Sequence, residues 1–216
     1  MKIVLGCTLA TLSFLLVMFS GQTWSIAAEG PVAFPPVSSV EQTLGQITSE
    51  DESVRDAAIR ILIEQGDVSL VPRLEEIRIN ASRSTRQAIK PLIDLLKNRG
   101  KLASPDSDVR RSAATDIGTS GKAPAIPWLE AAAAHEPNKW VRYTMEESTA
   151  LLKLASEDPS IKIAAIEKLG ELRSENGVPA MKVLVEAGAS AEATESQKRV
   201  ATAATASIKD IVTWGA

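Results

Sequence analysis

The chain has 216 residues, of which 44% are hydrophobic but only eight are aromatic, so a core has to be built mainly from alanine, leucine, isoleucine and valine. That composition suits thin helical layers better than a barrel or a sandwich. With 24 basic against 27 acidic residues there is no strongly basic face for nucleic acid, and one cysteine with one histidine cannot supply the usual ligands of a zinc site.

The first 28 residues have the composition of a secretory signal peptide. A basic residue precedes an uncharged apolar run over residues 3–19, and small residues follow before Glu29. Cleavage after Ala27 places Ser25 and Ala27 at the two positions that need small side chains; the alternative is an uncleaved membrane anchor. We therefore expect an exported, periplasmic protein, or one held at the periplasmic face of the inner membrane if residues 1–28 are retained.

Residues 29–46 contain Pro31, Pro35 and Pro36 among small and polar residues. Because proline disfavours a helix interior, this segment is predicted to be an extended linker. The remaining domain is predicted to span residues 47–213.

A repeat with offsets of 55 and 52 residues runs through this domain. An Asp-x-x-Val-Arg-x-Ala-Ala pattern starts at Asp51 and returns with conservative exchanges at Asp106 and Asp158. The same offsets align Leu62 with Ile117 and Leu169, Pro72 with Pro127 and Pro179, and Leu74 with Leu129 and Met181. The repeat predicts three units, at about residues 49–103, 104–155 and 156–213.

Each unit is predicted to contain about three helices. The three repeated aspartates are positioned as N-caps of the first helix, and a proline marks the start of the second. The first helix is expected to bury Val54, Ala58, Ile61 and Leu62 in the first unit, and to end at Gly66, Gly121 and Gly170 in the three units. The second helix is expected to face inward through Val71, Leu74 and Ile77, and the third to cover residues 85–97, 140–154 and 196–212. Small residues, namely Ala57, Ala58, Ala113, Ala164 and Ala165, are expected to let neighbouring helices approach closely.

The titratable residues show no catalytic pattern. His135 follows four alanines at an expected helix end, where a basic side chain satisfies the last carbonyl groups. The pairs at residues 75–76 and 146–147 are adjacent glutamates, which point about 100° apart on a helix, so we interpret them as a solvated face. We expect no catalytic, cofactor-binding or metal-binding residue, no cofactor and no enzyme activity.

A basic residue recurs early in the first and third helices: Arg55, Arg110 and Lys162, and Arg86, Arg142 and Arg199. One interpretation is a ladder that grips a carboxylate or phosphate. The favoured one is structural, with each arginine pairing with a capping acid of the next unit. Among the aromatic residues, Trp128 and Tyr143 are expected in the core, Trp140 fits a core or a partner contact equally well, and Trp214 is a candidate partner contact.

The repeated pattern resembles the HEAT-like repeats first associated with phycobilisome lyases. The wider arrangement of leader, first repeat, residues 78–86 and the segments LASPD at 102–106 and LASEDP at 154–159 resembles the N-terminal extracytoplasmic region of the urea ABC transporter permease subunit, over residues 41–212. The resemblance implies an all-α fold: an α-solenoid of HEAT-like (armadillo-type) helical repeats with three units of about three helices each, after a signal peptide.

The same resemblance implies a non-catalytic domain that contacts proteins of a urea or amide uptake system, either transporter membrane subunits or a solute-binding protein. The membrane helices of that family are missing here, so we expect a split or truncated permease. Membrane contact would come only from the leader or from a missing C-terminal part. The alternatives are a free-standing periplasmic HEAT-repeat interaction scaffold unrelated to urea, and a chromophore-lyase-like enzyme, against which export and the lack of a usable nucleophile both count.

Overall fold

The computed structural model describes residues 37–214, with the side chains of residues 39–214. The predicted signal peptide at 1–28 and residues 29–36 of the predicted linker lie outside the described residues. Within residues 37–214 the chain is all-helical and has no β-strand. The helices are α1 Val37–Gln46, α2 Glu52–Gln65, α3 Val71–Asn80, α4 Arg83–Lys101, α5 Ser107–Thr119, α6 Ile126–His135, α7 Lys139–Lys153, α8 Pro159–Glu171, α9 Val178–Ala189 and α10 Glu195–Trp214.

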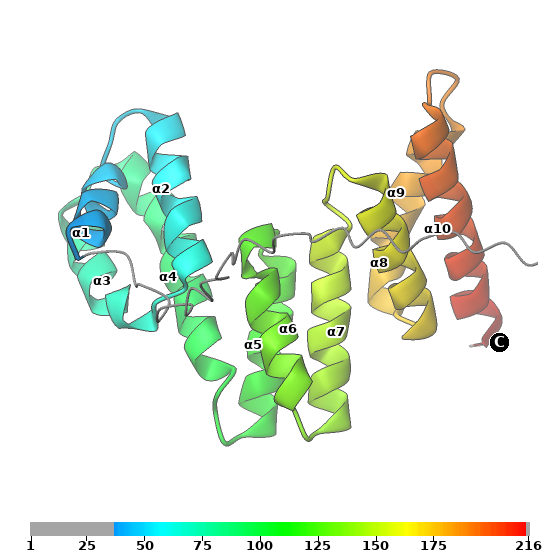
Figure 1. Cartoon of the computed structure of the whole chain (residues 1–216), viewed down its shortest axis with the longest axis horizontal. Coiled ribbons are helices and arrows are strands. Elements are labelled where there is room, and N and C mark those ends of the chain that lie inside the picture. The colour runs from blue at the N-terminus through cyan, green and yellow to red at the C-terminus, as the bar shows by residue number, and fades with distance from the viewer. Residues whose placement is uncertain (1–36, 215–216) are drawn as a thin grey trace, which may run out of the picture. The chain divides into compact units, whose positions relative to one another are not determined.

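After α1 the same order of elements occurs three times in the described residues (Figure 1). Each set has a helix, a short 3-10 turn, a second helix and a longer third helix. The 3-10 turns are η1 Val68–Leu70, η2 Ala123–Ala125 and η3 Glu175–Gly177. The first set is therefore α2, η1, α3 and α4, the second is α5, η2, α6 and α7, and the third is α8, η3, α9 and α10.

The helix starts follow from the repeated aspartates. The Asp51 carboxylate accepts the backbone N–H of Ser53 at 2.9 Å, and Asp106 and Asp158 accept the equivalent N–H groups at 2.8 Å. Each side chain satisfies an N–H group that has no partner within its helix. The predicted N-caps and the proline at the start of α3, α6 and α9 are confirmed.

The predicted end of the first helix is right in two sets and wrong in the third. Gly66 and Gly121 have positive φ angles of 60° and 66°, in the left-handed region that glycine tolerates best. Gly170 instead lies inside α8, and the residue with positive φ is Arg173 at 54°. Gly170 is required for a different reason, since a Cβ there would lie 2.8 Å from Ser207 Oγ on α10.

The aligned apolar positions form the core. Leu62, Ile117 and Leu169 are fully buried, as are Leu74, Leu129 and Met181. In α2 the buried positions are Arg55, Ala58, Ile59, Leu62 and Ile63, whereas Val54 and Ile61, both predicted to face inward, are 37% and 39% exposed. The buried stripe of α2 is therefore turned from the predicted one toward Ile59 and Ile63, which lie beside α4 and residues 120–124 of the second set.

The buried residues form two clusters, and their boundary falls within α7. The larger cluster draws on α1 to α7 and includes Val141, Met145 and Leu152. The smaller one draws on α7 to α10 and includes Ala150 and Leu154. Helix α7 thus contributes side chains to both cores.

Residues 37–46, predicted to belong to an extended linker, form α1. Val40, Leu44 and Ile47 follow each other at helical spacing, Leu44 and Ile47 are buried, and all three pack in the larger core against the first set. The prolines at 35 and 36 precede this helix, where proline is tolerated, so they did not exclude it. Among residues 37–214 no helix is long and apolar enough to span a membrane.

Candidate functional site

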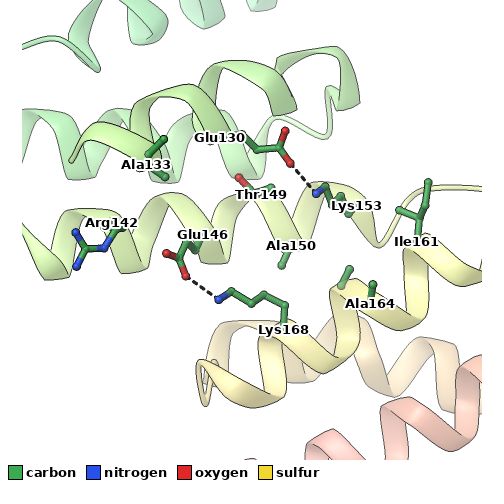
Figure 2. Close-up of a pocket in the computed structure, with 12 residues that line it drawn as sticks. Glu130, Ala133, Arg142, Glu146, Thr149, Ala150, Lys153, Ile161, Ala164 and Lys168 are labelled. Carbon is green, nitrogen blue, oxygen red and sulfur yellow. Dashed lines mark hydrogen bonds and ion pairs between the residues drawn. The ribbon is translucent and has the colours of Figure 1, made fainter. Parts of the chain in front are cut away.

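A groove lies where α6, α7 and α8 meet, between the second and third sets (Figure 2). Its volume is about 690 Å³. Alanine side chains and the exposed Ile161 form most of its wall, and charged side chains form its rim. The lining residues are Glu130, Ala133, Ala134, Arg142, Glu146, Thr149, Ala150, Lys153, Ile161, Ala164, Ala165 and Lys168.

The hollow arises from small side chains at positions where the preceding set has larger ones. The repeat offsets of 55 and 52 residues match Ala133 with Arg78, Ala134 with Ile79 and Ala164 with Ser112. Each exchange removes side-chain volume from the surface between two sets, and the wall that remains is apolar. Ala164, predicted as a packing residue, is exposed in this groove, whereas Ala165 is buried.

Two ion pairs border the alanine wall. Lys153 Nζ lies 2.7 Å from Glu130 Oε1, and Lys168 Nζ lies 2.8 Å from Glu146 Oε2. In Figure 2 the side chain of Ala150 lies between the two pairs. Because all four charged side chains are at least partly exposed, each pair contributes only about 0–1 kcal/mol to stability. These charges can therefore exchange partners with a bound molecule at low cost.

Three of the recurring arginines form hydrogen bonds to backbone carbonyl groups of this chain, instead of a ladder that faces a ligand. Arg55, Arg110 and Arg142, each four residues after an N-cap, donate to the backbone carbonyl oxygen six residues earlier, at 3.0, 2.8 and 2.8 Å. Each bond ties a helix to the loop that leads into it. Among the described residues no ion pair involves Arg86, Lys162 or Arg199.

Arg110 also forms a two-pronged pair with the carboxylate of Glu136. Its Nε and Nη2 atoms each lie 2.7 Å from one carboxylate oxygen, and only 3% of the Glu136 side chain is exposed. The prediction that such arginines pair with a capping acid of the next unit is therefore wrong for Arg110, because Glu136 belongs to the same set. The hydrogen bonds from Arg110 lower the pKa of Glu136, and that carboxylate raises the pKa of Arg110.

This pair makes stability depend on pH. A lowered pKa in the folded state stabilises the fold above the pKa of an unfolded glutamate, about 4.3, and this stabilisation is lost as pH falls through the folded pKa. We expect Arg110→Met to lower the urea midpoint at pH 7, and its difference from the wild type to shrink steadily below pH 4.3. Urea titrations at pH 7, 5, 4 and 3 measure this; a difference that stays constant with pH would contradict it.

Glu147 is buried, which corrects its interpretation as part of a solvated face. Only 6% of the residue is exposed. Ser174 Oγ donates to Glu147 Oε1 at 2.5 Å, Asn176 Nδ2 donates to the same oxygen at 3.3 Å, and the Tyr143 hydroxyl lies 3.4 Å from it. Burial and the charge of Glu147 raise the pKa of Tyr143. These bonds join α7 to η3 and hence the second set to the third. The neighbouring Glu146, which points into the groove, remains partly exposed as expected.

Glu147→Ala is expected to lower the free energy of unfolding by about 1–3 kcal/mol, because it leaves the fully buried Ser174 hydroxyl without its acceptor. Glu147→Gln, whose amide oxygen can still accept that bond, should cost less. The matched control is Glu146→Ala, which removes only a partly exposed ion pair and should cost about 0–1 kcal/mol. Urea unfolding of the three variants tests this order.

The aromatic residues divide between core and surface. Trp128 is buried as predicted, with the Arg99 guanidinium 5.2 Å from its ring, and Tyr143 is half-buried. Trp140 and Trp214 are 63% and 66% exposed. Trp140 lies under Lys139, and Arg173 stacks on Trp214 at 4.0 Å. His135 is the exposed last residue of α6, which confirms its predicted place at a helix end.

The groove has the chemistry of a binding surface. Its one hydroxyl, on Thr149, donates to the carbonyl oxygen of Met145 at 2.8 Å. No set of three histidine, cysteine or acidic side chains that could hold a metal ion occurs among residues 37–214. The groove is not predicted by the sequence, where its one signal is the run of alanines at 131–134.

Comparison with known proteins assigns no family. No family model matches the chain, and no curated protein matches it.

Proposed function

We propose that this protein is an exported, non-catalytic α-solenoid of HEAT-like repeats that binds another protein through the groove between α6, α7 and α8. The observation on which this rests is the alanine wall between the Glu130–Lys153 and Glu146–Lys168 pairs. An apolar wall beside exchangeable charges is typical of a surface that accepts a segment of protein.

The occupant that fits is an amphipathic helix of a partner. A volume of about 690 Å³ holds a few apolar side chains from one helix face, and the rim offers both signs of charge to that helix's flanking residues. The threefold order of helices and the resemblance of residues 41–212 to the urea permease region support a partner in a urea-type uptake system, either a membrane subunit or a solute-binding protein. The composition of residues 1–28 supports export.

Photo-crosslinking in the source cells tests the partner. With p-benzoylphenylalanine at the position of Ala164, we expect an adduct with a helical segment of a transporter subunit or solute-binding protein, identified by mass spectrometry. The control is p-benzoylphenylalanine at the position of Ala57, which is equivalent to Ala164 in the first set. Adducts only with proteins outside transport would instead support a free-standing periplasmic scaffold.

A variant that fills the groove tests the site. Ala164→Arg should reduce binding of the crosslinked partner, whereas Ala57→Arg should leave it unchanged. If the two substitutions reduce partner binding equally, the groove is not the binding site. Recovery of the protein from periplasm with Ala28 at its N-terminus would establish cleavage after Ala27.

A further inference from the structure

A second groove lies at the end of the third set, between α8 and α10, away from the residues that line the first one. Its volume is about 820 Å³. Its lining includes Glu167, Gly170, Arg173, Ser207, Asp210 and Trp214.

The same groove occurs between the first and third helices of the other two sets, and there the next set bounds it. Between α2 and α4, residues 120–124 of the second set close one side, and η2 packs against α2. Between α5 and α7, Asn176 of the third set closes one side of the groove and donates a hydrogen bond to Glu147. Among residues 37–214, only α8, Arg173 and α10 line the corresponding groove of the third set, and no further element covers it. The chain itself therefore shows what shape fits there: a short turn that leads into a helix.

The packing under the groove is also the same in two sets. A Cβ on Gly118 would lie 2.5 Å from Ser148 Cβ, and a Cβ on Gly170 would lie 3.1 Å from Ser207 Cβ. The first and third helices thus approach each other through a glycine and a serine in both sets. The groove of the third set is a further copy of a surface that the second set already uses.

Exposed apolar side chains lie at this end of the third set. Trp214 lines the groove and is 66% exposed, and Val212 beside it in the sequence is 59% exposed. The Arg173 guanidinium stacks on the Trp214 ring and holds it at the groove. Tryptophan and arginine are the residue types most enriched where binding energy concentrates.

Charge indicates the chemistry of the occupant. Glu167, Glu171 and Asp210 line the groove, and Arg173 is the one basic residue among its lining side chains. In the first set the corresponding groove contains Asp56 and the ion pair of Arg60 with Glu64, and the turn that bounds it brings Lys122. An occupant built like that turn would carry lysine or arginine.

A second copy of this chain fits less well. Two copies facing each other through α8 and α10 would bring acidic surfaces together, which is unfavourable. A head-to-tail arrangement would need a free face on α2, but α1 packs there and buries Leu44 and Ile47.

We propose that the groove between α8 and α10 is a second protein-docking surface, which takes a basic turn-and-helix edge of a partner protein in the way that η2 covers the groove between α2 and α4. This surface is separate from the groove of the proposed function, so either can fail without the other.

The test uses the full chain in the source cells, with p-benzoylphenylalanine at the position of Thr213, which lines the groove and is exposed. We expect one dominant adduct, with a helical segment of another protein that carries lysine or arginine within a turn of the crosslinked residue. An adduct with a second copy of this chain would overturn the proposal, as would an adduct pattern identical to that from the position of Glu192 in the loop before α10.

Charge reversal supplies a second measurement. Glu167→Lys combined with Asp210→Lys should reduce the yield of the Thr213-position adduct roughly tenfold, because it puts like charges across the interface. The control, Glu186→Lys with Glu192→Lys, makes the same change in net charge outside the groove and should leave the yield unchanged. Circular dichroism confirms that both variants keep their helix content; an equal yield from the two variants would overturn the proposal.

Discussion

Leu169→Ala is expected to lower the free energy of unfolding by about 2–5 kcal/mol, the range for removing most of a buried leucine from a core that only partly collapses. Leu169 is fully buried in α8, in the smaller of the two cores. A small core has few other side chains to close the resulting cavity. Urea titration followed by circular dichroism measures the loss.

The stability lost in Leu169→Ala should be unevenly distributed along the chain. Because the helices of the third set pack mainly against each other, in a core separate from that of α2 to α4, the amides of α8, α9 and α10 should exchange faster while those of α2, α3 and α4 keep their protection. Leu62→Ala, at the equivalent and equally buried position of the first set, should show the reverse pattern. Uniform loss of protection in both variants would mean that residues 37–214 unfold as one cooperative unit.

The second large effect concerns the contact between α5 and α7. Gly118→Leu should destabilise the protein by about 3 kcal/mol, the upper part of the range for overpacking a filled core. A Cβ at Gly118 would lie 2.5 Å from Ser148 Cβ and 2.9 Å from Ser148 Cα. Since the second of these atoms is backbone, the two helices have to move apart.

The matched control is Gly45→Leu in α1, where a Cβ meets no atom within 4 Å. Leucine favours a helix more than glycine does, so this variant should be neutral or slightly more stable. Adding Ser148→Gly to Gly118→Leu should recover part of the stability, because it removes the closest atoms but leaves the backbone. If Gly45→Leu destabilises as much as Gly118→Leu, close helix approach is not the cause.

What the sequence reveals about the fold is the part that repeats. The offsets of 55 and 52 residues predict the N-caps, the proline-led second helices and the buried positions shared by Leu62, Ile117 and Leu169, because all three units solve the same packing problem in the same way. Those features depend on local chemistry and on apolar spacing, both of which are visible in a single chain.

The parts that could not be predicted depend on which surface meets which. Nothing within the chemistry of residues 146–147 distinguishes an exposed Glu146 from a buried Glu147; the difference is that η3 lies over one of them. Arg173 takes the positive φ expected of a glycine because the third set has no glycine at that place in the repeat. To predict the groove, one would have to know that five alanines from three helices line the same hollow.

The sharing of α7 between the two cores has a consequence for binding energetics. Any occupant of the α6–α7–α8 groove touches residues on both sides of that boundary, so its binding free energy couples the unfolding of the larger core to that of the smaller. In the free protein we expect the third set to open while the rest of residues 37–214 stays folded. In the complex, opening either core releases the occupant. The two unfolding transitions, one for each core, therefore merge toward a single transition.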